Sequence, residues 1–182
     1  MRILGRCIVF ISLWLLLPIS AFAQQKPGVQ PAALDQLARN SGYIFSGTVI
    51  AVQRFVPREN AVAYTQISFR VDKAIQGVRS GDVFTIREWS GLWDSGERYR
   101  SGERVLLFLY PTSKLGFTSP VAGPLGRFAV DHVGNIHINE PQHTFFSFNR
   151  AHLQFAGRTR VSSREFTHAI LHASENEHEQ IR

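Results

Sequence analysis

The residues best suited to chemistry lie close together in the sequence, between positions 87 and 100. Arginine beside aromatic side chains can hold anionic polymers by charge and stacking. Trp and Arg are also the favoured anchors of protein interfaces. We therefore predict a surface that binds a ligand or a partner here. Its members are Arg87, Trp89, Trp93, Arg98, Tyr99 and Arg100.

A purely structural interpretation of the same residues stays open. Trp89 could close one end of a folded core, and Arg98 or Arg100 could pair with Asp94 or Glu97. The two interpretations differ in whether the indole ring of Trp89 is exposed or buried.

A second candidate is a pair of histidines four residues apart, His168 and His172. On a helix this spacing places both imidazoles on one face, and such a pair can bind zinc or copper when a third ligand joins it. The alternative is a solvated polar face opposite an apolar stripe that contains Phe166 and Ile170. The sequence contains no second group of metal ligands at a fixed spacing, so we predict no cofactor. Zinc bound by the histidine pair is kept as the alternative.

The sequence contains none of the glycine–serine elbow, HExxH, phosphate-loop or EF-hand motifs that announce a catalytic or ion site. Its carboxylates at Glu88, Glu103, Asp131 and Glu140 are isolated, with no spacing that pairs two of them for acid–base work. Structural roles are expected for them, and we predict no catalytic residue.

The first 23 residues have the three parts of a secretory signal. Arg2 and Arg6 precede an apolar run over 8–17, and the small residues of Ala21–Ala23 form a cleavage site. The run is about half the roughly 20 residues that a spanning helix needs. We predict an exported protein, periplasmic or extracellular, with no membrane-spanning segment in the mature chain.

Export removes the only cysteine, Cys7, so core burial must stabilise the mature domain. The formal charge of +6 falls to +4 when Arg2 and Arg6 leave. This balance is compatible with an acidic polysaccharide as partner. Nucleic acid is not expected outside the cell.

The central region alternates with the period of β-strands. Thr65, Ile67 and Phe69 face one way, and the residues between them face the other. The run over 105–110 (VLLFLY) is apolar throughout, which is typical of a strand covered on both faces. Strands are predicted over 43–52, 63–71, 82–89 and 105–110, with a hairpin over 128–138 that turns at 131–134.

Helices are predicted at both ends of this β region. Residues 24–40 read as a tether followed by a short helix over 32–39, and 41–139 as the β domain. The extension over 140–182 begins with a segment, 140–160, that could be strand or irregular chain. It continues with a helix over 162–177, which Ser162 and Glu165 start as a capping box.

Three motifs resemble the netrin-like domains, the group that includes the N-terminal domain of the tissue inhibitors of metalloproteinases. They are GTV in the first strand, V-x-K-x-x-x-G at the end of the second, and GERVLLFL around the fourth. The resemblance covers about 70 residues and implies a small five-stranded OB-like barrel. The inhibitors bind the protease zinc through an N-terminal cysteine, which is lacking here, so their activity does not carry over.

These observations favour a non-enzymatic exported binding module that contacts an envelope or extracellular protein. The segment 89–100 and the long loop over 111–126 are its expected contacts. Two alternatives remain: a metal-binding protein or enzyme that uses the histidine pair, and a binder of anionic polysaccharide.

Overall fold

The structure, a computed structural model, describes residues 34–56, 62–94, 99–147, 155 and 157–180. For residues 93–94, 145–147 and 172–180 it describes the backbone alone. All of them belong to one compact unit that extends from Pro31 to Arg182. The predicted signal peptide and tether lie outside the described residues.

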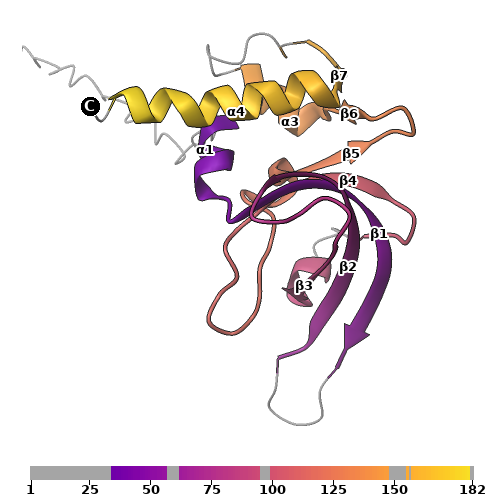
Figure 1. The fold of residues 1–182 in the computed structure, drawn as a ribbon. Coiled ribbons are helices and arrows are strands. Elements are labelled where there is room, and N and C mark those ends of the chain that lie inside the picture. Colours follow the sequence, from indigo (N-terminus) through magenta and orange to yellow (C-terminus); the bar gives the residue numbers. More distant parts are fainter. Residues whose placement is uncertain (1–33, 57–61, 95–98, 148–154, 156, 181–182) are drawn as a thin grey trace, which may run out of the picture. The chain divides into compact units, whose positions relative to one another are not determined.

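The described chain is mainly β, as predicted, and its strands form one antiparallel sheet of seven (Figure 1). Their order is β3-β2-β1-β4-β5-β6-β7. The strands are β1 (Tyr43–Phe55), β2 (Tyr64–Gln76), β3 (Val83–Trp89), β4 (Arg104–Leu109), β5 (Arg127–Val130), β6 (Asn135–His137) and β7 (Arg160–Ser162).

The predicted closed barrel of five strands is wrong: in the described part of the chain the sheet is open and has seven strands. A barrel would need a continuous strand between β4 and β3, but the loop over 110–126 contains Pro111, Pro120 and Pro124. Proline lacks the N–H that a sheet requires. The loop forms an isolated bridge from Pro120 to Leu109. It also donates a hydrogen bond from the N–H of Val121 to the carbonyl of Phe108 (2.8 Å) and one from the N–H of Thr118 to the carbonyl of Arg87 (3.0 Å).

The all-apolar run lies in β4, and the prediction that both its faces are covered is confirmed. Val105, Leu107 and Leu109 belong to a cluster with the inner side chains of β1, β2 and β3. Leu106 and Phe108 belong to a second cluster beneath the helices. Because β4 contributes to both, it lies between two hydrophobic cores.

The predicted terminal helices are both present. They are α1 (Leu34–Asn40) and α4 (Ser163–Gln180). Leu34 and Leu37 of α1 share a cluster with Phe166 and Ile170 of α4, and the two helices contact each other. Helix α4 also contacts β6 and β7 (Figure 1). The Oγ of Ser162 accepts the N–H of Glu165 at 3.2 Å, which is one half of the expected capping box.

The segment over 140–160, which we expected to be strand or irregular chain, begins instead with a helix, α3 (Glu140–Ser147). Asn139 and Gln142 cap it reciprocally. The Asn139 side chain accepts the Gln142 N–H at 3.0 Å, and the Gln142 side chain accepts the Asn139 N–H at 2.9 Å. The remaining short elements are α2 (Gly91–Asp94) and η1 (Gly123–Gly126).

Candidate functional site

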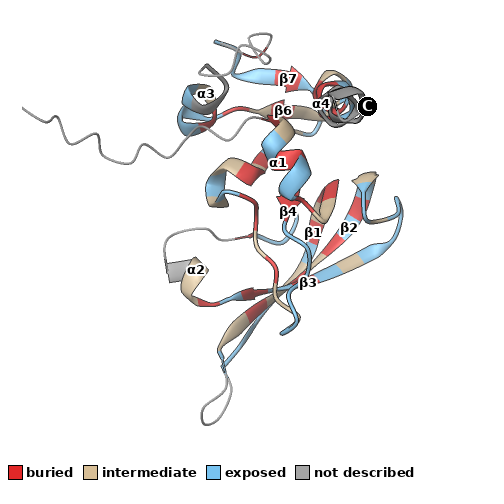
Figure 2. Ribbon diagram, turned by 90° about the vertical axis from the view of Figure 1, so that its left-hand side faces the viewer, coloured by how far each residue is buried: buried red, intermediate tan, exposed pale blue. Residues whose placement is uncertain are grey.

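Arg87 and Trp89 lie on the outward side of edge strand β3. The side chains of the strand alternate: Ile86 and Glu88 are buried, and Arg87 and Trp89 are exposed. In Figure 2 most of β3 has the colour of exposed residues. The Trp89 side chain is 56% exposed, so it does not close the end of the core.

The other four residues of the predicted surface are distributed differently. Tyr99 is buried, 4% exposed, and packs edge-on against Phe69 with ring centroids 5.5 Å apart. Arg100 is exposed, and its backbone N–H donates to Glu103. Arg98 and the side chain of Trp93 lie outside the described residues. Of the six, the structure therefore brings Arg87 and Trp89 together on one surface.

The register of the sheet adds side chains that sequence reasoning missed. Strands β1, β2 and β3 contribute three outward rows, each of three paired residues, which we call the aromatic face. The rows are Phe55, Tyr64 and Trp89; Gln53, Gln66 and Arg87; and Ala51, Ser68 and Thr85.

Contacts within the aromatic face confirm that these side chains share one surface. The rings of Phe55 and Tyr64 stack with centroids 4.8 Å apart, and the guanidinium of Arg87 lies 5.4 Å from the Tyr64 ring. The hydroxyls of Ser68 and Thr85 are 2.8 Å apart. The nine residues include aromatic rings, amides, hydroxyls and one cation, but no carboxylate, so the surface offers stacking, hydrogen bonds and a positive charge.

The backbone after β3 leaves room for the indole ring of Trp89. A Cβ atom at Gly91 would lie 2.4 Å from a ring carbon of Trp89, closer than real atoms approach. The ring therefore rests on the bare backbone of Gly91. More than half of Trp89 is nevertheless exposed.

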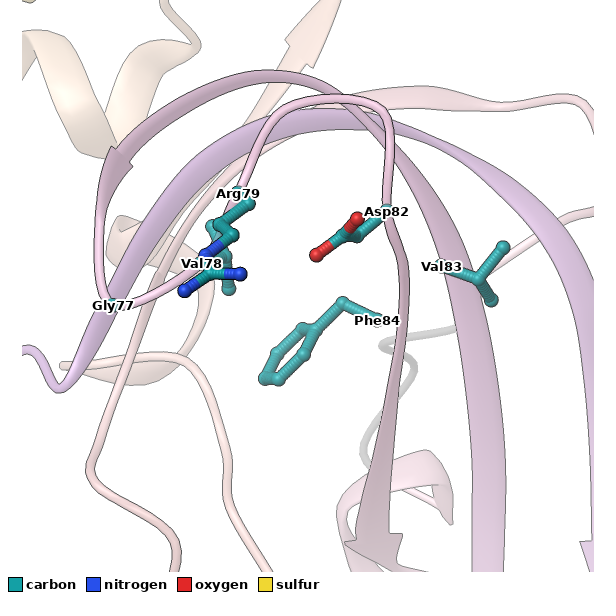
Figure 3. Close-up of a pocket in the computed structure, with 6 residues that line it drawn as sticks. All are labelled: Gly77, Val78, Arg79, Asp82, Val83 and Phe84. Atoms are coloured by element: carbon teal, nitrogen blue, oxygen red, sulfur yellow. The ribbon is translucent and has the colours of Figure 1, made fainter.

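A hollow of about 400 Å³ lies at the beginning of β3, beside the turn from β2. Figure 3 shows the charged ends of Arg79 and Asp82 pointing toward the same space as the Phe84 ring. That ring also packs on Tyr43, with centroids 4.9 Å apart. Both charged residues are exposed on a turn, so solvent screens them and the hollow offers little selectivity.

A second hollow, of about 420 Å³, lies near the other end of β3. One of its walls is Glu88, whose carboxylate is buried and accepts the Tyr99 hydroxyl at 3.2 Å. From the sequence, we predicted that Glu88 is an isolated carboxylate with a structural role. The other lining residues are Leu92, Tyr110, Ser119, Pro120, Ala122, Gly123 and Pro124.

His168 and His172 both lie on α4, as predicted, and His168 is exposed. The side chain of His172 lies outside the described residues. Within the residues that the structure describes, no three His, Cys, Asp or Glu side chains come together as a metal site would need. The described part of the chain therefore places no third ligand beside the histidine pair, which the metal-binding alternative would need.

Asp131 closes the predicted hairpin between β5 and β6. Its carboxylate accepts the N–H of Asn135 at 2.8 Å and the N–H of Val133 at 3.0 Å. The Asn135 N–H is the largest of the effects that together lower the pKa of Asp131 to about 2; its side-chain amide, the Val133 N–H and His137 act in the same direction. The carboxylate therefore has a structural role at the turn.

Glu165 forms an ion pair with Arg158 at the beginning of α4. This hydrogen bond lowers the pKa of Glu165 and raises that of Arg158. Because the Glu165 carboxylate binds Arg158, it does not complete the capping box with Ser162.

Comparison of the chain with protein-family models, with curated proteins and with solved structures finds no match. Among the helices of the described residues, none is both long and apolar enough to cross a bilayer.

The sequence contains only part of the information needed to predict the other residues of the aromatic face. Alternation places Tyr64 on the outward side of its strand, since Thr65 and Ile67 point inward. The pairing of Tyr64 with Phe55 and Trp89 depends on register, which the sequence alone does not specify. Phe117, whose ring lies 6.0 Å from that of Tyr64, belongs to the long loop that we expected to contact a partner.

Proposed function

We propose that this protein is an exported, non-enzymatic binding module that contacts an envelope or extracellular protein through the aromatic face. The observation that carries the proposal is the row formed by Phe55, Tyr64 and Trp89, with Arg87 over the middle ring. Export itself rests on the signal-like sequence of residues 1–23.

The chemistry of the row supports a protein partner. Interfaces are enriched in aromatic residues and arginine, and depleted of carboxylates in their centre. Exposed apolar side chains also gather on β1–β3 and at the ends of these strands, where a soluble surface would carry polar groups. They are Ile50, Phe55, Val56, Val62, Val83 and Trp89.

The relationship to netrin-like domains remains part of the proposal. It is supported by the pairing of β1 with both β2 and β4 and by the hydrogen bond from Thr118 to Arg87, which links the long loop to β3. An OB-like scaffold commonly binds its ligand across a strand face and the adjoining loops. Trp89 and Phe117 occupy such positions here.

Site-specific photocrosslinking in the native envelope fraction tests the proposal. A photoreactive residue at Thr85, within the aromatic face, should crosslink a defined protein. The same residue at Val133, which is 86% exposed on the β5–β6 turn, should not. Trp89→Ala should abolish the crosslink from position 85, and the control Val133→Ala, on the exposed β5–β6 turn, should preserve it.

Equal crosslinking from positions 85 and 133 would reject the aromatic face as the interface. Binding of acidic polysaccharide that depends on Trp89 and Arg87, without a protein crosslink, would replace the protein partner by the polysaccharide alternative. That alternative draws on the same stacking rings and on the cation at Arg87.

A further inference from the structure

Strand β3 forms one edge of the sheet in the described part of the chain. The carbonyl of Asp82 accepts the N–H of Val71 at 2.9 Å, which shows which main-chain groups at this edge face β2. In an antiparallel pair, only every second residue exchanges hydrogen bonds with the neighbouring strand. The N–H and C=O groups of Val83, Thr85 and Arg87 therefore point away from β2.

The long loop meets this edge near its far end. The N–H of Thr118 donates to the carbonyl of Arg87 at 3.0 Å, which agrees with the alternation described above. Among the described residues, the structure gives neither Val83 nor Thr85 a main-chain hydrogen bond on this side. Val83 is 62% exposed, and Thr85 is exposed as well. Such an exposed row of main-chain donors and acceptors is a template for one more strand.

We propose that the edge from Val83 to Arg87 accepts an extended segment of the partner protein as an added antiparallel strand, with acidic side chains on the outward side of the sheet and apolar side chains on the inward side. The inference rests on the protein partner proposed above and names how that partner binds. The antiparallel direction follows that of every strand pair in the described sheet. In this mode main-chain hydrogen bonds supply affinity, and alternate side chains supply specificity.

Two arginines on the outward side of the sheet favour acidic side chains there. Arg87 belongs to β3 itself, and Arg70 is paired with Val83 across the sheet and has a side chain that is 61% exposed. The carboxylate of Asp72 lies 3.7 Å from Arg70, but it also pairs with Arg104 at 3.8 Å. One carboxylate is thus shared between two cations, and an acidic residue on the added strand would complement the remaining positive charge.

The inward side of the same edge adjoins the hollow of about 400 Å³. Val83 and Phe84 line it, and Figure 3 shows the Phe84 ring directed into the same space as the side chains of Arg79 and Asp82. Because these two opposite charges offset each other, the hollow suits an uncharged side chain beside the ring. A strand places successive side chains on opposite faces, so a segment that alternates acidic and apolar residues fits both sides of the edge.

The experiment is an NMR titration of the full mature protein with a capped peptide that alternates glutamate and valine, following backbone amide shifts. The peptide should produce saturable shifts at the amides of Val83, Thr85 and Arg87, because these N–H groups would donate to it. A peptide that alternates lysine and valine has the same strand-forming pattern and the opposite charge. It should bind at least about tenfold more weakly, since its ammonium groups would face the two arginines.

Two N-methylated peptides test the main-chain hydrogen bonds on the unmodified protein. In an antiparallel pair, the residues that bond to Val83 and Thr85 lie opposite them and place their side chains on the same face. These residues are the glutamates of the peptide. Methylation of the glutamate amides should therefore weaken binding at least about tenfold. Methylation of the valine amides, which face away from β3, should weaken it far less.

Val83→Pro tests the same edge in the native envelope fraction. Proline is accommodated at the first residue of a strand and on an edge where the N–H faces solvent, so the domain should fold. The variant should weaken the partner crosslink from position 85, because it removes a main-chain donor. Val83→Ala, the matched control, keeps this N–H and should preserve the crosslink.

Peptide shifts located elsewhere, equal binding of the lysine peptide, or binding that methylation of the glutamates leaves unaltered would each overturn the added strand. A crosslink that persists unchanged in Val83→Pro would retain the aromatic face as the interface and overturn this mode of binding. The absence of any protein crosslink in the wild type would instead reject the proposed function, and the titration would still decide whether the edge accepts a strand.

Discussion

Leu107 and Phe108 are neighbours in the chain, yet their side chains lie in different hydrophobic cores. Leu107 packs with the inner side chains of β1–β3, and Phe108 packs beneath the helices with Phe128, at a ring-centroid distance of 5.9 Å. Truncating one of these residues therefore removes part of the β4 contribution from one core and leaves the other core intact.

Truncation of either residue should destabilise the whole domain. Phe108→Ala should lower the free energy of unfolding by about 3–5 kcal/mol and Leu107→Ala by about 2–5 kcal/mol, through lost burial and a new cavity. Urea denaturation measures both values. Val133→Ala, at an exposed position, should change the value by less than about 0.5 kcal/mol. A loss below about 1 kcal/mol at either core position would contradict the two-core description.

Gly91→Ala should displace the indole ring of Trp89 without unfolding the protein. The new Cβ would meet the ring, which is the movable end of a side chain, so the ring shifts rather than the backbone. The indole N–H resonance of Trp89 should move, and the partner crosslink from position 85 should weaken as in Trp89→Ala. Val133→Ala, at an 86% exposed position of the β5–β6 turn, serves as a comparison for the indole resonance. An unchanged resonance in Gly91→Ala would show that the ring lies elsewhere.

The carboxyl of Asp131 should titrate unusually low. Its folded pKa of about 2 lies below the ordinary 3.8, so in that interval the unfolded chain binds more protons than the folded one. The stability that Asp131 contributes is complete above pH 3.8 and is lost as the pH falls through about 2. Carbon-detected NMR titration of Asp131 measures the folded pKa directly, and a midpoint near 3.8 would refute the hydrogen bonding described at the turn.

Asp131→Asn checks the same relationship through stability. The variant keeps a hydrogen-bonding side chain but does not titrate, so its stability should depend less on pH than that of the wild type between pH 3.8 and 2. Denaturation curves across this interval provide the comparison. Identical pH slopes would mean that the folded carboxyl is not stabilised.

Gln142→Ala should destabilise the region around α3. Gln142 is 1% exposed, caps the helix with Asn139 and donates to the carbonyl of Arg127 at 2.8 Å. Losing these bonds should cost about 1–3 kcal/mol of unfolding free energy, because the part-buried carbonyl of Arg127 loses a donor. Thermal unfolding measures the change, with Glu140→Gln as the exposed control. A melting temperature equal to that of the control would contradict the capping role.

Local sequence patterns were sufficient to predict those strands and helices whose structure depends on residues close together in the chain. The alternation in β2, the run of β4 and the stripe of α4 each identified an element and its buried side. Helix α3 was not predicted, although Asn139 and Gln142 have the spacing of a capping box, because the aromatic residues at its end and after it, Phe145, Phe146 and Phe148, also suit a strand. Strand β7, three residues long, carries too little pattern to be recognised.

Long-range pairing accounts for most of what the sequence could not reveal. The sheet order, and with it the failure of the barrel to close, depends on β4 pairing with β5 and β6 with β7. The burial of Tyr99 against Phe69 and the stacking of Phe55 on Tyr64 depend on contacts across strands. Trp89 and Arg87 were identified because they are close in sequence and alternate on one strand.

The position of β4 between the two cores also determines how the domain opens. Neither half can lose its packing without exposing one side of this strand, so the halves should unfold as one cooperative unit. The amides of Val105 to Phe108 should accordingly be the last to exchange with deuterium, and the slowest exchange in both halves should report the same global free energy.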